Sequence, residues 1–367
     1  MIFPYQRHSK QGITKELEMF EQCIELGQRI NLEKQYPRQN ANRRDAQQRA
    51  GKGYRVEKQE VTPDRFNILA TTSSPARVVF STHLDTVPPF IPSSEDSEYI
   101  YGRGACDAKG IIASQIFAAE RLRRDGKDDL GFLFTVDEEL ASTGAQLANK
   151  HPMASQCEFL VNGEPTDNLV AVGTKGSMRV ILTSEGRAAH SAYPEAGDSA
   201  INKLIEVLVD LRNLEWPSDN FFGETTCNIG VVSGGTRPNV IADAARAELQ
   251  IRLATDNEST KALVRETVGD RAQIEFASAH DPVRLFSLPG FEECLVRFTT
   301  DIPYLSNWGK PLLIGPGSIL VAHTEHEKVS KKELLKAIDL YVNVASAVGL
   351  SMTSKWNRSV PIRGIVG

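Results

Sequence analysis

The stretch "RVVFSTHLDTVPPF", residues 77–90, places a histidine and an aspartate two residues apart directly after an apolar run. The run predicts a buried strand, which Pro88 and Pro89 end because proline cannot donate to a sheet ladder. Residues i and i+2 of a strand point to the same face, so His83 and Asp85 share one side of a strand end. The pair is either a core histidine satisfied by a neighbouring acid or part of a functional site, and the rest of the chain decides between these.

The composition is that of an ordinary globular protein, with 367 residues, 41 % hydrophobic and 24 % charged. This length allows two domains with separate cores. The net charge of −5 argues against a nucleic-acid or membrane-surface partner. The five cysteines are scattered without CxxC spacing, which favours reduced thiols. No apolar run approaches the roughly 18 residues of a membrane span, and no signal peptide is evident, so we expect a cytoplasmic protein.

The pattern of apolar residues predicts two kinds of structure along the chain. Between residues 54 and 164, short strand-like runs alternate with a long helical segment, which favours a largely parallel, helix-covered sheet. Between residues 177 and 279, four strand-like and two helical segments indicate a compact α+β unit. After Pro282 the chain is expected to return to helix, followed by a glycine-rich stretch with a strand before His323, and then a final helix.

Polar side chains recur at the expected strand ends. Because ligands at the carboxyl ends of strands in an open α/β sheet converge on one crevice, these side chains are expected to meet. Histidines with several carboxylates suit a pair of zinc ions that share a bridging carboxylate, and such a pair can activate water and polarise a carbonyl. Each acid alone is more often a helix cap or a solvated charge, but the set together favours a metal site. The set comprises His83, Asp107, Glu138, Glu139, Glu164 and His323.

Seven motifs then occur in order: "HLDTVP", "GRGACDAKG", "DEE", "GEPT", "GRAAHSAYPEAGDSAI", "RPNVI" and "GPGS…AHTEHE". With them, the chain from Tyr54 onward resembles the acetylornithine deacetylase / succinyl-diaminopimelate desuccinylase / carboxypeptidase G family of dinuclear zinc amidohydrolases. The resemblance implies an α/β fold with a zinc-dependent catalytic domain made of residues 1–173 and 281–367. It also implies an inserted α+β domain, residues 174–280, with two helices on a four-stranded sheet, which acts as a lid and forms a homodimer.

The resemblance assigns the metal ligands residue by residue. Asp107 is expected to bridge two Zn²⁺ ions, for which Co²⁺ or Mn²⁺ are possible substitutes. His83 and Glu164 are expected to complete one site, and Glu139 with His323 the other.

It also assigns the catalytic roles. Glu138 is expected to be the general base, which takes a proton from the attacking water and gives it to the leaving amine. Asp85 is expected to be the carboxylate that orients His83, as metal-bound histidines usually require.

Four further residues are candidates for substrate contact, and the resemblance assigns the first three of them. His190 is expected to reach the partner subunit's active site and stabilise the tetrahedral oxyanion. Asn239 and Arg252 are expected to hold the substrate's amide and carboxylate, although Arg252 equally fits a strand residue that faces water. Gly317, in "GPGS", either offers main-chain amides to the substrate or simply forms a tight turn.

Residues 34–53 depart from the family pattern, because they lack the usual loop and the apolar stripe of a helix. A shifted reading frame and a divergent surface segment both explain this departure, and all expected metal ligands lie downstream of it.

Three functions remain in view. The first is hydrolysis of an N-acyl amino acid by a deacetylase or desuccinylase. The alternative is a metallo-dipeptidase or carboxypeptidase that cleaves a peptide bond by the same chemistry. A metal-free binding protein on this scaffold is the third, and the presence of every ligand and of Glu138 argues against it. The sequence does not specify the acyl group or side chain of the substrate.

Overall fold

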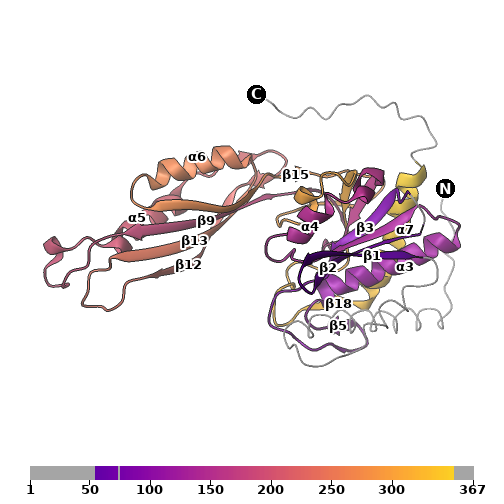
Figure 1. Ribbon diagram of the computed structural model, residues 1–367, viewed down its shortest axis with the longest axis horizontal. Coiled ribbons are helices and arrows are strands. Elements are labelled where there is room, and N and C mark those ends of the chain that lie inside the picture. Colours follow the sequence, from indigo (N-terminus) through magenta and orange to yellow (C-terminus); the bar gives the residue numbers. More distant parts are fainter. Residues whose placement is uncertain (1–53, 73–74, 351–367) are drawn as a thin grey trace. The chain divides into compact units, whose positions relative to one another are not determined.

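The structure, a computed structural model, describes residues 54–72 and 75–350. The helix expected at residues 12–33 and the polar segment 34–53 lie outside these residues. The chain divides into two compact units (Figure 1). Of the described residues, the first unit contains those up to Val170, Phe286–Glu292 and those from Tyr304 to Leu350, and the second contains Ala171–Leu285 and Glu293–Pro303.

The first unit is built around a mixed sheet. Its central strands, β6, β3, β7 and β17, are parallel to one another. Strand β2 pairs antiparallel with β6, and β1 pairs antiparallel with β2. The mostly parallel sheet expected from the sequence is therefore confirmed for the centre of the sheet. The strands, in spatial order, are β1 (Arg55–Thr62), β2 (Arg65–Thr71), β6 (Leu130–Thr135), β3 (Val78–His83), β7 (Phe159–Asn162) and β17 (Lys310–Leu313).

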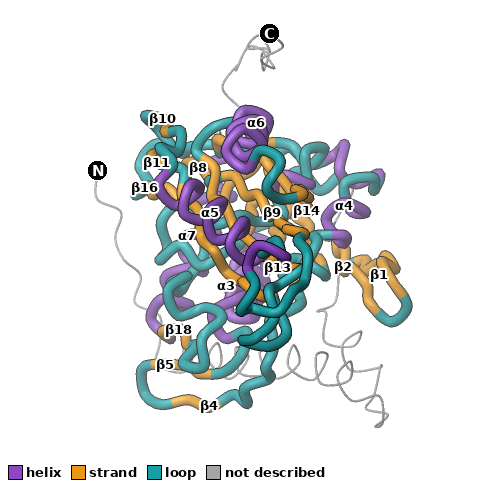
Figure 2. Tube along the Cα trace, turned by 90° about the vertical axis from the view of Figure 1, so that its left-hand side faces the viewer, coloured by secondary structure: helices purple, strands orange, loops and turns teal. Residues whose placement is uncertain are grey.

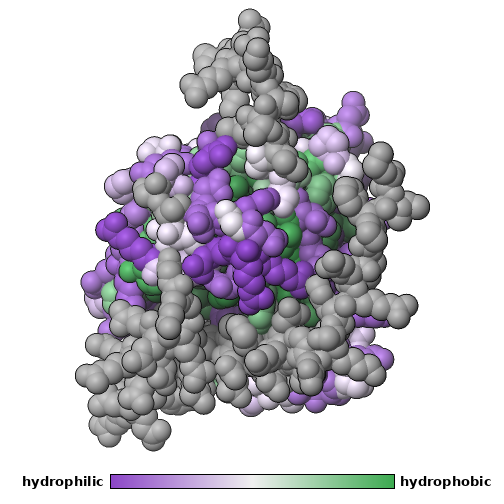
Figure 3. All heavy atoms as spheres, turned by 90° about the vertical axis from the view of Figure 1, so that its right-hand side faces the viewer, coloured by the Kyte–Doolittle hydropathy of each residue, from purple (hydrophilic) through white to green (hydrophobic). Residues whose placement is uncertain are grey.

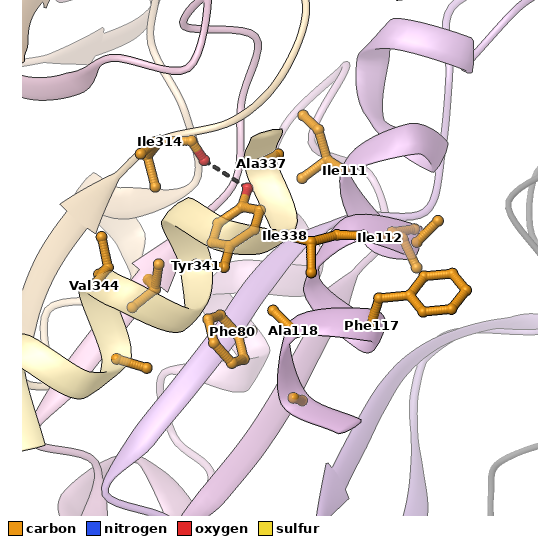
Figure 4. Close-up of a cluster of buried hydrophobic side chains, with 14 of the residues drawn as sticks. Phe80, Ile111, Ile112, Phe117, Ala118, Ile314, Ala337, Ile338, Tyr341 and Val344 are labelled. Atoms are coloured by element: carbon orange, nitrogen blue, oxygen red, sulfur yellow. Dashed lines mark hydrogen bonds between the residues drawn. The ribbon is translucent and has the colours of Figure 1, made fainter. Parts of the chain in front are cut away.

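Helices cover this sheet, which explains why its central strands are continuous apolar runs. Every residue of β3, β6 and β7 is buried, as in strands covered on both faces. Helices α3 (Gly110–Arg124) and α7 (Lys331–Leu350) pack against each other over Phe80 of β3 (Figure 4). The ring of Tyr341 meets Phe80 edge-on at 5.7 Å between centroids, and its hydroxyl donates to the main-chain oxygen of Ile314 at 2.7 Å.

Shorter elements complete the first unit. A small sheet joins β18 to β5 and β5 to β4, and Trp308 is buried in a second apolar cluster beside α4. The elements are β4 (Ser94–Glu95), β5 (Tyr99–Tyr101), η1 (Ala105–Lys109), α4 (Thr143–Ala148), η2 (Pro152–Gln156) and β18 (Lys328–Ser330). The short helix η4 (Ile302–Tyr304) lies at the boundary between the units, with its first two residues in the second.

The second unit is an antiparallel sheet covered by two helices. Its strand order is β12-β13-β9-β14, and Figure 2 shows α5 lying over β9 and β13. Apolar residues of both helices pack on the alternating buried residues of β9 and β13, and Ser199 and Asp256 cap the helices at their N-termini. The elements are β9 (Gly176–Glu185), α5 (Ala200–Asn213), β12 (Thr226–Gly234), β13 (Ala244–Leu253), α6 (Asn257–Val268) and β14 (Gln273–His280).

Strand β12 forms one edge of this sheet and is unusually apolar for an edge. Val232 on this strand is 57 % exposed, and its neighbour Val231 is also exposed. An exposed apolar edge strand is a template for pairing with another chain. The remaining short elements of the unit are β8 (Val170–Thr174), η3 (Pro194–Ala196), β10 (Ser218–Asp219), β11 (Gly223–Glu224), β15 (Val283–Arg284) and β16 (Glu293–Val296).

Two sequence expectations about the later part of the chain are wrong. The helix expected after Pro282 is absent from residues 283–305, which contain β15, β16 and η4. Pro289 and Gly290 interrupt any helix there, because proline lacks the N–H donor and Gly290 has a φ of 90°. The segment before His323 is a series of turns and not a strand, and Leu320 within it is 83 % exposed.

The two compact units also differ from the predicted domain boundaries. Residues 171–173, 281–285 and 293–303, which the sequence analysis assigns to the catalytic domain, lie in the second unit, and β16 in the last of these segments pairs with β8. The catalytic and lid roles of the two domains stay predictions.

Three general features of the described residues are the character of their surface, the state of their cysteines and the length of their apolar helices. The described residues on the face in Figure 3 are mainly hydrophilic, with apolar residues between them. Four cysteines lie among the described residues, and all four are free. No described helix combines the length and the apolar character needed to cross a membrane.

Candidate metal centre

The centre begins at the end of β3, where His83 is 1 % exposed. Its Nε2 lies 2.7 Å from Oδ1 of Asp107, and its Nδ1 lies 3.0 Å from the main-chain oxygen of Asp85. Because a carbonyl oxygen can only accept, Nδ1 carries the proton in this hydrogen bond, and Nε2 is the atom presented to Asp107.

The structure thus differs from the expected role of the Asp85 side chain. The nearest carboxylate oxygen of Asp85 is 3.8 Å from Nδ1 of His83, so the main chain of Asp85 makes the orienting contact. The carboxylate instead accepts the main-chain N–H groups of Glu138 and Glu139, each at 3.3 Å. Asp85 therefore ties the end of β3 to the two glutamates that follow β6.

Asp107 lies in the turn η1 before α3, and its carboxylate is buried between two histidines. One oxygen is 2.7 Å from Nε2 of His83, and the other is 3.2 Å from Nε2 of His323. Burial alone raises the pKa of this carboxyl, but the two imidazoles outweigh that effect and hold it below its usual range. Asp107 is thus an ionised, buried carboxylate with one oxygen for each histidine.

Two groups of potential ligands share this carboxylate. His83, Asp107 and Glu164 form one group, and Asp107, Glu139 and His323 form the other; within each group one ligand atom per residue lies within 4.8 Å of the others. Imidazole nitrogen with carboxylate oxygen is a donor set that suits a divalent metal such as zinc. The ligands therefore fit two ions with a common carboxylate.

The electrostatics of the two histidines follow from these carboxylates. Burial lowers the pKa of His83, but the charges of Asp107, Glu164 and Glu138 outweigh it and hold that pKa well above its usual value. Hydrogen bonds to Asp107 and Glu139 raise the pKa of His323 to about 10. Without a metal ion, His323 is consequently protonated at neutral pH, and the carboxylates favour the protonated form of His83 as well.

A buried lysine that the sequence analysis did not single out also faces this cluster. The Lys109 ammonium donates to the main-chain oxygen of Leu84, between His83 and Asp85. Burial lowers the pKa of Lys109 to about 8, against the opposite effect of the carboxylates of Asp85 and Asp107. A lysine among the small residues of "GACDAKG" is the signal that sequence reasoning could have used.

The glycine-rich turn that contains Gly317 lies against the centre. Gly317 has a φ of 84°, and a Cβ atom there would lie 2.5 Å from Sγ of Cys106, the residue before Asp107. A Cβ atom on Gly315 would likewise lie 2.5 Å from the main-chain oxygen of Glu164. These two positions need glycine for close packing, and a substrate contact by Gly317 stays a prediction.

The other residues expected to contact the substrate lie in the second unit. His190 and Asn239 are both exposed and adjacent, since the N–H of Ser191 donates to the main-chain oxygen of Asn239 at 3.0 Å. Arg252 lies on β13, with Nη1 3.4 Å from Oγ1 of Thr299. Their roles toward a substrate stay predictions.

Comparisons with known proteins identify the family. A peptidase M20 domain-containing protein of Schizosaccharomyces pombe is 37 % identical over 302 residues, which are 79 % of this chain and 75 % of that protein. The chain belongs to the M20 peptidase family. A probable carboxypeptidase of Aspergillus terreus is 36 % identical over 321 residues, covering 77 % of this chain and 74 % of that protein. The resemblance found in the motifs is thereby confirmed.

Domain profiles and solved structures support the fold. The peptidase dimerisation domain matches residues 172–274, and peptidase family M28 matches residues 67–214. The di-peptidase Dug1p of Saccharomyces cerevisiae superposes with a TM-score of 0.70 at 14 % identity, covering 92 % of this chain and 97 % of that chain. Human carnosine dipeptidase 1 gives a TM-score of 0.67 at 16 % identity, covering 90 % and 97 %. The expected α/β fold with an α+β dimerisation domain is confirmed.

Proposed function

We propose that this M20 peptidase hydrolyses the C-terminal peptide bond of short peptides, with two divalent metal ions and Glu138 as general base. The observation that carries the proposal is the buried Asp107 carboxylate, whose two oxygens serve two separate groups of histidine and carboxylate ligands. The names of the relatives, carboxypeptidases among them, favour the peptide alternative of the sequence analysis over the N-acyl amino acid.

In this proposal His83, Asp107 and Glu164 hold one ion, and Asp107, Glu139 and His323 hold the other. When bound, a pair of zinc ions supplies Lewis-acid polarisation of the carbonyl and a lowered pKa for water. The chain itself sets the tautomer of His83. The main-chain oxygen of Asp85 accepts the proton on Nδ1, so Nε2 is directed toward the centre.

Glu138 is left for proton transfer because it belongs to neither group of ligands. Its main-chain N–H is held by the Asp85 carboxylate, and its charge acts on His83, so it lies at the same edge of the sheet. Its carboxylate accepts a proton from the attacking water and then donates that proton to the leaving nitrogen. Neighbouring Glu139 contacts His323 instead, with its oxygens 3.0 and 3.1 Å from Nε2.

Two exposed leucines near the centre bear on which substrate side chain is preferred. Leu140 directly follows Glu139 and is 81 % exposed, and Leu320, three residues before His323, is equally exposed. Large apolar side chains exposed next to polar site residues are typical of a binding surface. We therefore expect a preference for an apolar residue beside the cleaved bond.

The second unit is proposed to form a homodimer through the exposed edge strand β12, in keeping with its match to a dimerisation domain. His190 and Asn239 are proposed to contact the substrate from this unit, and Arg252 to bind its carboxylate through a bidentate guanidinium contact.

A substrate panel tests the proposal. The purified protein, loaded with Zn²⁺, Co²⁺ or Mn²⁺, is assayed against N-blocked dipeptides, free dipeptides, and N-acetyl and N-succinyl amino acids. We expect release of the C-terminal amino acid from N-blocked dipeptides, fastest with apolar residues, and its loss in Asp107→Ala. Faster cleavage of N-acyl amino acids would instead support a deacetylase or desuccinylase. A protein that neither binds metal nor turns over any of these substrates would overturn the assignment as an enzyme.

A further inference from the structure

Glu327 is a buried acid outside both ligand groups, and it contacts the turn that carries Asp107. Its side chain is 2 % exposed. Its Oε1 accepts three main-chain N–H groups, from Gly104 at 2.9 Å, Cys106 at 3.1 Å and Asp107 at 3.0 Å. Its Oε2 accepts from Nη1 of Arg103 at 2.6 Å.

The main chain around Glu327 holds the same segment from the other side. Its own carbonyl oxygen accepts the N–H of Gly102 at 3.0 Å, and the next residue, Lys328, pairs with Tyr101 where β18 meets β5. Between Gly102 and Asp107, every residue except Ala105 therefore makes a hydrogen bond to Glu327.

The turn needs such a partner because it is not a regular helix. Asp107 and Ala108 have non-helical backbone angles, with φ values of −124° and −137°, and the turn lacks a side-chain cap from Gly104. Buried main-chain N–H groups without an acceptor are costly, and one carboxyl oxygen of Glu327 satisfies three of them here. Without Glu327, the N–H groups of Gly104, Cys106 and Asp107 would lose the acceptor that they share.

The position of Asp107 matters more than that of any other ligand, because both ligand groups share it. A shift of its main chain moves one oxygen relative to His83 and the other relative to His323. Glu327 also follows His323 by four residues, so one short segment supplies a ligand of the second group and the support of the shared ligand.

We propose that Glu327 is a positioning residue that fixes the Asp107 turn and thereby sets the affinity of both metal sites. This inference rests on the proposed function for its metal sites, but the attachment of the turn is testable in metal-free protein. Loss of a partner that supports a ligand typically costs about 10–100-fold in metal affinity. Because Asp107 is shared, both ions should weaken together.

The test compares Glu327→Gln and Glu327→Ala with Glu158→Gln. Glutamine keeps the shape and one acceptor oxygen but loses the charge that faces Arg103, whereas alanine removes every contact. Glu158 is a matched control, because it accepts Nε and Nη2 of Arg77 at 2.8 and 3.0 Å in the same unit without touching the metal centre. Circular dichroism establishes that each variant is folded, and the glutamine variant carries the test if the alanine variant is not.

The first measurement is hydrogen exchange of metal-free protein on peptides that span residues 101–109. We expect exchange at least about tenfold faster in Glu327→Gln, faster still in Glu327→Ala, and unchanged in Glu158→Gln. Exchange like the wild type in both Glu327 variants would overturn the proposal. This result is independent of whether the protein binds metal or hydrolyses peptides.

The second measurement is metal affinity by chelator competition, with the Co²⁺ absorption spectrum as a report on ligand geometry. We expect both ions to bind about 10–100-fold more weakly in Glu327→Gln, with an altered spectrum, and the wild-type result in Glu158→Gln. Weakening of one ion alone, or equal weakening in the control, would also overturn the proposal. Failure of the wild type itself to bind two ions would instead overturn the proposed function.

Discussion

The replacement Glu138→Gln separates proton transfer from metal binding. Glutamine has the size of glutamate and leaves the main-chain hydrogen bond from residue 138 to Asp85 in place. Glu138 lies in neither ligand group, so both ions should remain. Loss of general-base assistance costs about 10²–10⁴-fold in rate, or about 2.7–5.4 kcal/mol of transition-state stabilisation.

Glu139→Gln is the contrasting variant because it differs by one position. Glu139 is one of three residues in the second group, and its oxygens lie 3.0 and 3.1 Å from Nε2 of His323. A neutral amide is a poorer ligand than a carboxylate, so we expect one ion to weaken while the ion held by His83 and Glu164 stays.

The assay measures kcat and KM on the best substrate of the panel, together with metal content by mass spectrometry after gel filtration. For Glu138→Gln we expect a large fall in kcat with KM and metal content nearly unchanged; for Glu139→Gln we expect a fall in both metal and rate. Equal metal loss in the two variants would mean that the glutamates share or exchange roles. Unchanged turnover in Glu138→Gln would remove Glu138 from the mechanism.

Three further results follow from the structure. Asp107→Ala should lose both of its roughly two ions per chain, because the carboxylate is shared; metal content unchanged from the wild type would contradict the assignment. Val232→Lys should convert a dimer to a monomer in sedimentation, whereas Ala277→Lys on the opposite edge strand should not; dimers in both variants would exclude the β12 interface. Zinc binding near neutral pH should release protons and tighten as pH rises, because the pKa of His323 is raised to about 10 and that of His83 is also raised; calorimetric enthalpies that do not depend on the buffer would refute this.

The strands that carry the centre were predictable because they are buried on both faces. In β3 and β6 every residue is buried, so each appears in the sequence as an apolar run that a polar residue ends. The carboxyl ends of neighbouring parallel strands share one edge, and for that reason His83, Glu139 and Glu164 could be expected to meet.

His323 was expected at the end of a strand that the structure does not contain, so the motif order is what identifies it. The residues before it form turns with an exposed Leu320, and its own φ is 63°, so no periodic pattern leads to it. The residues that hold the main chain of the centre in place could not be predicted for a related reason. Asp85 and Glu327 act by accepting main-chain N–H groups, and such contacts depend on the path of the backbone and not on residue types at a spacing.

The negative charge at the centre requires positive partners. Asp107 and Glu164 are buried and Glu138 and Glu139 half-buried at one edge of the sheet, where like charges are costly at low dielectric. In the metal-free protein, Lys109, whose ammonium is itself buried, and His323 offset part of this charge, and the raised pKa of His83 favours its charged form too. Two divalent ions would replace the histidine protons and add positive charge at the shared carboxylate. Since ligands that bind the folded state alone stabilise it, metal loading should raise the free energy of unfolding of the first unit as well as enable hydrolysis. The same carboxylates therefore couple the stability of this unit to its proposed chemistry.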